Sequence, residues 1–158
     1  MIIEVFEANL EKHDVAHLKP RVGVRAILKH GDQYVLIYHD AWNLYTLPGG
    51  GVEQKETLKE ALVREVKEET GYSIVHLEKS LTLIEYFTDS IWEHHFYTCE
   101  TSGQQTALSL TAEEQDAGHR VVHKSYFEIL DIFSHHDTLH HNGDAIVQRE
   151  FLGFIHSL

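Results

Sequence analysis

Cysteine is almost absent from this sequence, because Cys99 is the only one among 158 residues. A single cysteine excludes an internal disulfide and favours a reducing compartment, so we expect a cytoplasmic protein. No nucleophile motif surrounds Cys99, and we expect it to be a buried structural thiol. Proline is also scarce, with only Pro20 and Pro48, and neither a linker nor an internal repeat divides the chain. The length therefore predicts one domain over residues 1–158.

Positive charge is in short supply, since 13 Lys and Arg residues face 25 Asp and Glu residues, for a formal net charge of -12. This balance disfavours attraction to DNA, RNA or anionic lipid, so we expect no nucleic-acid polymer as partner. Long hydrophobic runs are missing as well, and residues 1–14 contain three glutamates and no signal-peptide pattern. We therefore expect no membrane association. A polyanionic small molecule would need a local positive site or bridging metal ions.

The patterns that are present predict a mixed sheet covered by helices, which is an α/β fold. Two β-rich runs within residues 21–38 surround a turn at Gly31 and Asp32 and indicate a hairpin. Pro48 and the following three glycines indicate a loop. Further strands are expected at residues 44–47, 73–76, 81–88, 94–100 and 119–123. Helices are expected at residues 57–70, from residue 125 onwards and at residues 144–156, with capping-box spacing at the first two starts and Gly71 after the first helix.

The helix predicted at residues 57–70 carries acidic residues on its inward face. At 100° per residue, Leu58, Ala61, Leu62 and Val66 form one apolar stripe. Glu65 projects onto this stripe, Glu69 lies about 40° to one side and Glu68 about 60° to the other. Two carboxylates about 6 Å apart repel by about 3 kcal/mol at an effective dielectric constant of about 20, and desolvation adds to that cost. A divalent cation with oxygen ligands would compensate, and Mg²⁺ suits such a site.

Arg64 is the cation nearest to these carboxylates in the sequence. It lies four residues from both Glu60 and Glu68, so it can orient a carboxylate through a charge-assisted hydrogen bond. A plainer interpretation is that Arg64 and the neighbouring lysines, Lys55, Lys59 and Lys67, balance a solvated acidic helix. The inward projection and the glycine loop before the helix weigh against it.

The segment from Gly50 to Tyr72 resembles the Nudix box, G-x5-E-x7-R-E-U-x-E-E-x-G-U, in which U is a bulky apolar residue. Every fixed letter is present, including Glu56, Arg64 and the three glutamates of the helix. Tyr72 stands at the last U position in place of the usual aliphatic residue, and Lys55 stands where many members have glycine. The resemblance implies a Nudix-like α/β/α sandwich with a mixed β-sheet.

The same resemblance implies hydrolysis of a nucleoside diphosphate-linked substrate, with Mg²⁺ or Mn²⁺ as cofactor. Carried over, Glu65, Glu68 and Glu69 are the metal-binding carboxylates, the Gly50 carbonyl is a further ligand, and Glu65 is also a candidate for positioning or deprotonating water. Arg64 and Glu56 are expected to orient the carboxylates and hold the loop to the helix. The partner is then a small-molecule nucleotide or nucleoside diphosphate derivative, and family members are often homodimers.

In this family a carboxylate beyond the box often supplies the base or a further metal ligand. Glu113 and Glu114 are the candidates here, with Glu114 preferred, and an exposed loop or helix start is the competing interpretation. Glu85 and Glu93 are weaker alternatives.

Some aromatic side chains are numerous enough to stack on a nucleobase, although a core role is the better expectation for each of them. They are Tyr45, Tyr86, Phe87, Trp92 and Phe96. Arg25 could bind a phosphate or pair with a core carboxylate. His135, His136, His140 and His141 form a cluster between two predicted helices, for which a solvated, pH-sensitive loop is a better expectation than zinc.

The main functional hypothesis is a nucleotide pyrophosphohydrolase acting on a nucleoside triphosphate or a damaged analogue. The rival is a catalytically weak nucleotide-binding sensor or interaction module on the same fold. A prenyl diphosphate isomerase ranks lower because Cys99 lacks a catalytic context. The extra signatures typical of ADP-ribose and diadenosine polyphosphate hydrolases are not found after the box.

Overall fold

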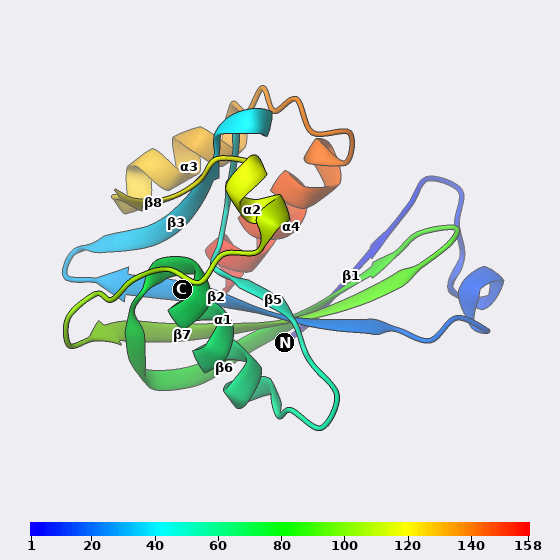
Figure 1. The fold of residues 1–158 in the computed structure, drawn as a ribbon. Coiled ribbons are helices and arrows are strands. Elements are labelled where there is room, and N and C mark those ends of the chain that lie inside the picture. The colour runs from blue at the N-terminus through cyan, green and yellow to red at the C-terminus, as the bar shows by residue number, and fades with distance from the viewer.

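The computed structural model describes residues 1–158 as a mixed β-sheet with helices on both of its faces (Figure 1). The strands are β1 (Ile2–Phe6), β2 (Arg21–His30), β3 (Gln33–His39), β4 (Leu44–Thr46), β5 (Gly49–Gly51), β6 (Ser73–Tyr86), β7 (Ile91–Ser102) and β8 (His119–Lys124). The α-helices are α1 (Leu58–Thr70), α2 (Ala112–Asp116), α3 (Tyr126–Ser134) and α4 (Gly143–His156). Two 3-10 turns, η1 (Lys12–Val15) and η2 (Asp40–Trp42), complete the list.

The sheet is mixed because two of its strand pairs are parallel. The path runs β1-β6-β7-β2-β3-β4, with β5 paired to β2 and β8 paired to β3. Strand β1 is parallel to β6 and β2 is parallel to β7, while the other pairs are antiparallel. Strand β3 pairs with the C-terminal end of β2, and β5 pairs with residues near its N-terminal end. The sheet therefore divides next to the glycine loop.

Alternation along β2 divides the core into two layers. Val24, Ala26 and Leu28 pack with α1, whereas Ile27 packs with α3 and α4. The helices therefore cover both faces, and the predicted α/β sandwich is confirmed. No helix is both long and apolar enough to cross a membrane.

Local sequence signals predict most elements correctly. The hairpin of β2 and β3 turns at Gly31 and Asp32, and the strands near residues 44–47 and 119–123 are present. Helix α1 has the predicted capping box between Thr57 and Glu60, and it ends at Gly71 with φ of 75°. Helices α3 and α4 also form where they were expected. Cys99 is buried as expected, and its burial raises the pKa of the thiol to about 12.

Two expectations about strands are wrong. The segments at residues 73–76 and 81–88 form the single strand β6, because irregularities in its pairing with β7 absorb the polar residues between them. The triple glycine, expected to be a loop, is the short strand β5 paired with Gly23–Arg25. A Cβ atom on Gly49 would lie 2.0 Å from the carbonyl oxygen of Val24, so only glycine permits this close approach.

An element that the sequence did not predict extends the sheet at its N-terminal edge. Strand β1 pairs with the end of β6, and together with the neighbouring end of β7 it forms a projection that we call the arm (Figure 1). Val15, Tyr86 and Ile91 make a small core at this arm. The arm therefore has apolar packing of its own.

Candidate active site

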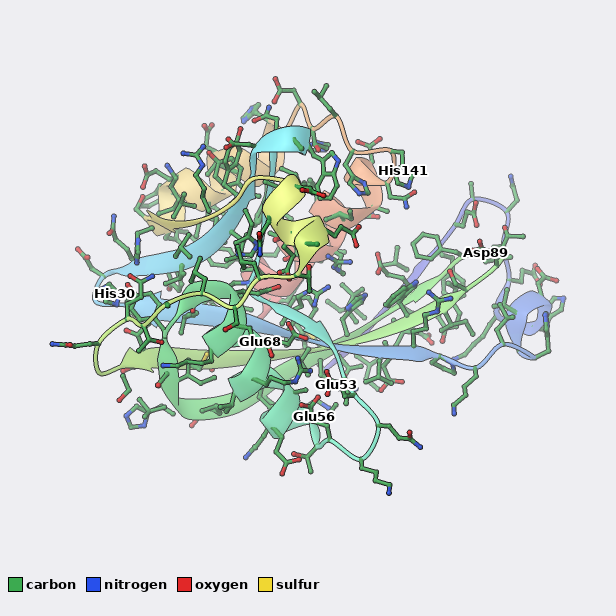
Figure 2. The ribbon with its side chains drawn as sticks, viewed as in Figure 1. His30, Glu53, Glu56, Glu68, Asp89 and His141 are labelled. Carbon is green, nitrogen blue, oxygen red and sulfur yellow. The ribbon has the colours of Figure 1, made fainter.

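Arg64 joins helix α1 to the loop that precedes it. Its Nε donates to Glu56 Oε2 at 2.7 Å, and its Nη2 donates to Glu56 Oε1 at 2.9 Å and to the Gly51 carbonyl at 3.1 Å. The hydrogen bonds from Arg64 lower the pKa of Glu56 to about 2. Figure 2 labels Glu53 and Glu56 on this loop and Glu68 on the helix. This paired geometry fixes the loop against the helix.

Three carboxylates lie along the same helix. Glu65 Oε1 accepts from Arg64 Nη1 at 2.8 Å and is 15% exposed, whereas Glu68 is 41% exposed and lies 3.4 Å from the same nitrogen. Glu69 Oε2 accepts from the Gly49 amide at 2.8 Å. Burial raises the pKa of Glu65 and raises that of Glu69 further, and the charge of Glu65 adds to the shift of Glu69. The folded protein therefore holds two carboxylates whose negative charge is destabilised.

The chemistry of this donor set fits a hard divalent cation. The glycine loop lies directly against the helix, since a Cβ atom on Gly50 would be 2.5 Å from the carboxyl carbon of Glu65. No group of three or more His, Cys, Asp or Glu side chains converges closely enough to enclose a metal ion. Mg²⁺ does not require such a cage, because it retains waters and takes one or two carboxylates together with substrate phosphates. Glu65, Glu68, Glu69 and the Gly50 carbonyl are the groups available for it.

His119 lies between the helix and the carboxylate candidate beyond it, a position that no sequence signal predicts. Its Nε2 lies 3.0 Å from the Glu69 carbonyl oxygen and its Nδ1 lies 3.7 Å from Glu114 Oε2. The side chain of His119 is 1% exposed. Glu114 is itself fixed by a capping box with Thr111 at the start of α2. Its charge also contributes to the raised pKa of Glu69.

A cavity of about 700 Å³ lies between the arm and α4. Arg25 and Arg149 line it, and both contact the fully buried Glu150, at 3.5 Å and 2.5 Å respectively. Glu150 also accepts from the Leu47 amide at 2.6 Å, so it fixes the start of the glycine loop. One buried carboxylate thus faces two guanidinium groups. Glu7, Glu85 and Asp89 also line the cavity, so the two arginines form a local positive site within a wall of mixed charge.

Arg25 connects the cavity to the carboxylate site. It pairs in register with Gly49, whose amide donates to Glu69, and the charges of Glu65 and Glu69 act on its guanidinium. Both sequence-based roles for Arg25 are therefore compatible with its position, since it pairs with a core carboxylate and also lines the cavity.

Comparison with known proteins identifies the family. The NUDIX domain model matches residues 19–149. This chain belongs to the Nudix family. An ADP-ribose pyrophosphatase from Methanocaldococcus jannaschii is 43% identical over 66 residues, which cover 40% of this chain and 38% of that protein. An RNA pyrophosphohydrolase from Hydrogenovibrio crunogenus is 38% identical over 60 residues, which cover 37% and 34%. The chain thus spans well under two thirds of the length of these curated relatives.

Solved Nudix structures share the fold. A NUDIX hydrolase from Nitrosomonas europaea superposes with a TM-score of 0.65 at 21% identity, over 87% of this chain and 89% of that one. A MutT NUDIX hydrolase from Burkholderia pseudomallei superposes with a TM-score of 0.58 at 20% identity, over 82% and 97%.

Other candidate residues of this Nudix chain lie in different places. Glu113 is exposed, whereas Glu114 is half-buried beside His119. Glu93 pairs with His95 at 2.7 Å. Glu85 is buried in the wall of the cavity, where it contacts His94 at 3.1 Å, and burial raises its pKa to about 6. Of the four carboxylates considered beyond the box, Glu114 therefore lies next to the Nudix helix.

The aromatic candidates divide between the core and the cavity. Tyr86 and Phe96 are buried, and the ring of Tyr45 packs against that of Tyr38 at an interplanar angle of 45°. Phe87 and Trp92 line the cavity, so the expected core role is wrong for these two. Trp92 stacks on His94 with ring centroids 5.8 Å apart.

The histidine cluster lies on the loop between α3 and α4. His135 is 76% exposed and pairs with Asp131. His140 packs edge-on against Trp42 and stacks on His141, and burial lowers its pKa. Figure 2 labels His141 on this loop. The cluster is thus partly solvated and partly packed, at a distance along the chain from the Nudix helix.

Proposed function

We propose that this Nudix protein hydrolyses the diphosphate linkage of a nucleotide or another nucleoside diphosphate derivative, with Mg²⁺ or Mn²⁺ as cofactor. The observation that carries the proposal is the chain of contacts from Glu69 through Gly49 to Arg25. It connects a helix carboxylate to the wall of a cavity that contains two guanidinium groups, those of Arg25 and Arg149. This connection supports a single site in which the helix carboxylates hold the cation and the two arginines bind phosphate.

The size of the cavity and the net charge of the chain support a small-molecule substrate. Its volume of about 700 Å³ lies within the usual range for ligand sites. The formal net charge of -12 disfavours a nucleic-acid polymer. The names of the two curated relatives, ADP-ribose pyrophosphatase and RNA pyrophosphohydrolase, both describe cleavage of a pyrophosphate bond and support a linkage of that type.

Each residue of the site has a distinct role in the proposed reaction. Glu65, Glu68, Glu69 and the Gly50 carbonyl hold the cation, which when bound neutralises phosphate charge and lowers the pKa of coordinated water. Arg64 orients Glu65 through its hydrogen bond. Arg25 and Arg149 bind phosphate oxygens from the cavity side. Glu114 accepts the proton of the attacking water, and its capping box with Thr111 holds it at the start of α2.

A hydrolysis screen tests this function. Purified protein with Mg²⁺ or Mn²⁺ is incubated with nucleoside triphosphates, oxidised nucleotides, sugar nucleotides and dinucleotides, and phosphate-containing products are quantified. The proposal predicts turnover of at least one class. Glu114→Gln should lower kcat by about a hundredfold or more, whereas the neighbouring exposed substitution Glu113→Gln should leave it unchanged. Saturable nucleotide binding without turnover would contradict the proposal and favour a sensor.

A further inference from the structure

The N-terminal segment, residues 1–18, lies outside the range that matches the Nudix domain, yet it is packed against that domain. Strand β1 pairs in parallel with Thr82–Tyr86 of β6. Val15 is 1% exposed and packs in the small core with Tyr86 and Ile91. Lys12 and Tyr86 both bond to Glu4 at 2.7 Å. The segment therefore has a defined position on the arm.

Glu7 connects the N-terminal segment to the cavity. Its Oε2 accepts from the Thr88 amide at 2.7 Å and from the Thr88 hydroxyl at 2.8 Å. The Glu7 amide donates to the Tyr86 carbonyl at 2.9 Å, so its backbone is fixed as well. Glu7 and the whole turn of residues 87–90 line the cavity. One carboxylate oxygen thus holds the turn that forms the outer wall.

The wall opposite this turn is α4 with the loop that leads into it. Asn142, Ala145 and Ile146 line the cavity from that side. Figure 2 shows Asp89 on the arm, across from His141 on the loop before α4. The inner part of the cavity has the charged groups Arg25 and Arg149, which are 14% and 12% exposed. The outer part combines the aromatic and apolar side chains of Phe87, Trp92 and Ile146 with the polar residues of the turn, and it suits a planar nucleoside end better than a phosphate.

We propose that the N-terminal segment is part of the substrate site and that Glu7 is a positioning residue for it. Glu7 holds the turn of residues 87–90 in place, and this turn closes the cavity around the nucleoside end of the substrate. The inference rests on the proposed function, because it assumes that a nucleoside diphosphate occupies this cavity. Glu7 takes no part in the chemical step, since it lies on the arm and contacts none of the Nudix-box residues.

The test compares Glu7→Ala, which removes both hydrogen bonds, with Glu7→Gln, whose side-chain oxygen can still accept them. The probes are the α,β-methylene diphosphates of adenosine, guanosine, cytidine and uridine, which cannot be hydrolysed at that bridge. Calorimetric titration in Mg²⁺ identifies the probe that wild type binds best and gives its Kd in each variant. We expect Glu7→Ala to raise this Kd about tenfold and Glu7→Gln to restore it to within about twofold of wild type, an effect of the size that two lost hydrogen bonds give. Glu100→Ala, an exposed site on β7, is the control and should leave the Kd unchanged.

Turnover adds a readout that general damage to the fold would not reproduce. With the substrate found in the hydrolysis screen, Glu7→Ala should raise KM and leave kcat unchanged, because ground-state binding alone is lost. If Glu7→Ala does not fold, Thr88→Val removes only the hydroxyl donor and should raise the Kd about threefold. An unchanged Kd in a folded Glu7→Ala, or an equal rise in Glu7→Gln, overturns this inference alone. Failure of wild type to bind any of the four probes overturns the proposed function together with it.

Discussion

The imidazole Nε2 of His119 lies 3.0 Å from the backbone carbonyl oxygen of Glu69. A carbonyl oxygen only accepts hydrogen bonds, so Nε2 carries a proton and His119 is the donor. This bond satisfies a carbonyl in the last turn of α1, where intrahelical partners run out. It also holds the strand β8 that follows α2 against the helix that carries the metal-binding candidates.

The first prediction concerns this bond. His119→Phe keeps an aromatic ring but leaves the Glu69 carbonyl without its partner, so it should lower the free energy of unfolding by about 1–3 kcal/mol. His119→Gln retains a donor and should lose less. Urea denaturation followed by circular dichroism gives both values. Equal losses for the two variants would show that ring packing, and not the hydrogen bond, is what matters.

Glu69 should reduce stability in the absence of metal. Burial and the charge of Glu65 raise its pKa, so its ionised form is disfavoured in the folded protein. Glu69→Gln removes this charge and should raise the Tm of the metal-free protein, while abolishing the increase in Tm that Mg²⁺ gives to wild type. Differential scanning calorimetry with EDTA and with Mg²⁺ measures both effects. A metal-dependent increase that persists in the variant would exclude Glu69 as an important ligand.

Lys55 adopts a left-handed backbone conformation with φ of 66°. This explains why glycine is common at this position in sequences that carry the box, because a side chain there is strained. Lys55→Gly removes this strain, but it also gives the unfolded chain more conformational freedom, which opposes the gain. The free energy of unfolding should therefore rise by up to about 1 kcal/mol. Chemical denaturation checks this. Lys55→Ala, which keeps a Cβ atom, should give no such gain.

The buried imidazole of His39 should lower the free energy of unfolding in acid. Burial and the neighbouring His119 lower its pKa from 6.5 to about 4, so the unfolded chain binds a proton that the folded chain does not bind between these two values. Stability from this group is complete above pH 6.5 and falls as the pH drops toward 4, by up to about 3 kcal/mol. His39→Phe should show a smaller decrease between pH 7 and pH 4, whatever its stability at pH 7. Parallel slopes for variant and wild type would contradict this.

Local signals explain why much of the fold could be predicted from the sequence. The capping boxes at Thr57 and Ser125 act within four residues, and the hairpin turn is equally local. Strand β1 could not be found in this way, because its partner β6 lies about 80 residues away and its residues carry no turn or alternation signal of comparable strength. Strand β6 continues through the residues between the two predicted segments, where His76 has a φ of 56° and the pairing with β7 shifts in register, and no local sequence signal marks such an irregular continuation.

The part of the candidate site that lies on one helix, at fixed spacings, could be predicted from the sequence. Glu65, Glu68 and Glu69 needed only helical periodicity and the box that surrounds them. Arg149 and Glu150 are as important to the cavity, yet they belong to α4 and meet Arg25 only through the fold. A single sequence contains no signal for such long-range pairing.

The most direct test of the central claim is the rate of product release from the best substrate of the hydrolysis screen, measured over a Mg²⁺ titration. Wild type and the exposed control Glu100→Gln should show the same saturable, Mg²⁺-dependent rate. Glu69→Gln should be inactive at every concentration, because the cation then lacks its buried ligand. Metal-independent turnover, or a Glu69→Gln variant as active as the control, would contradict the assignment of this helix as the catalytic centre.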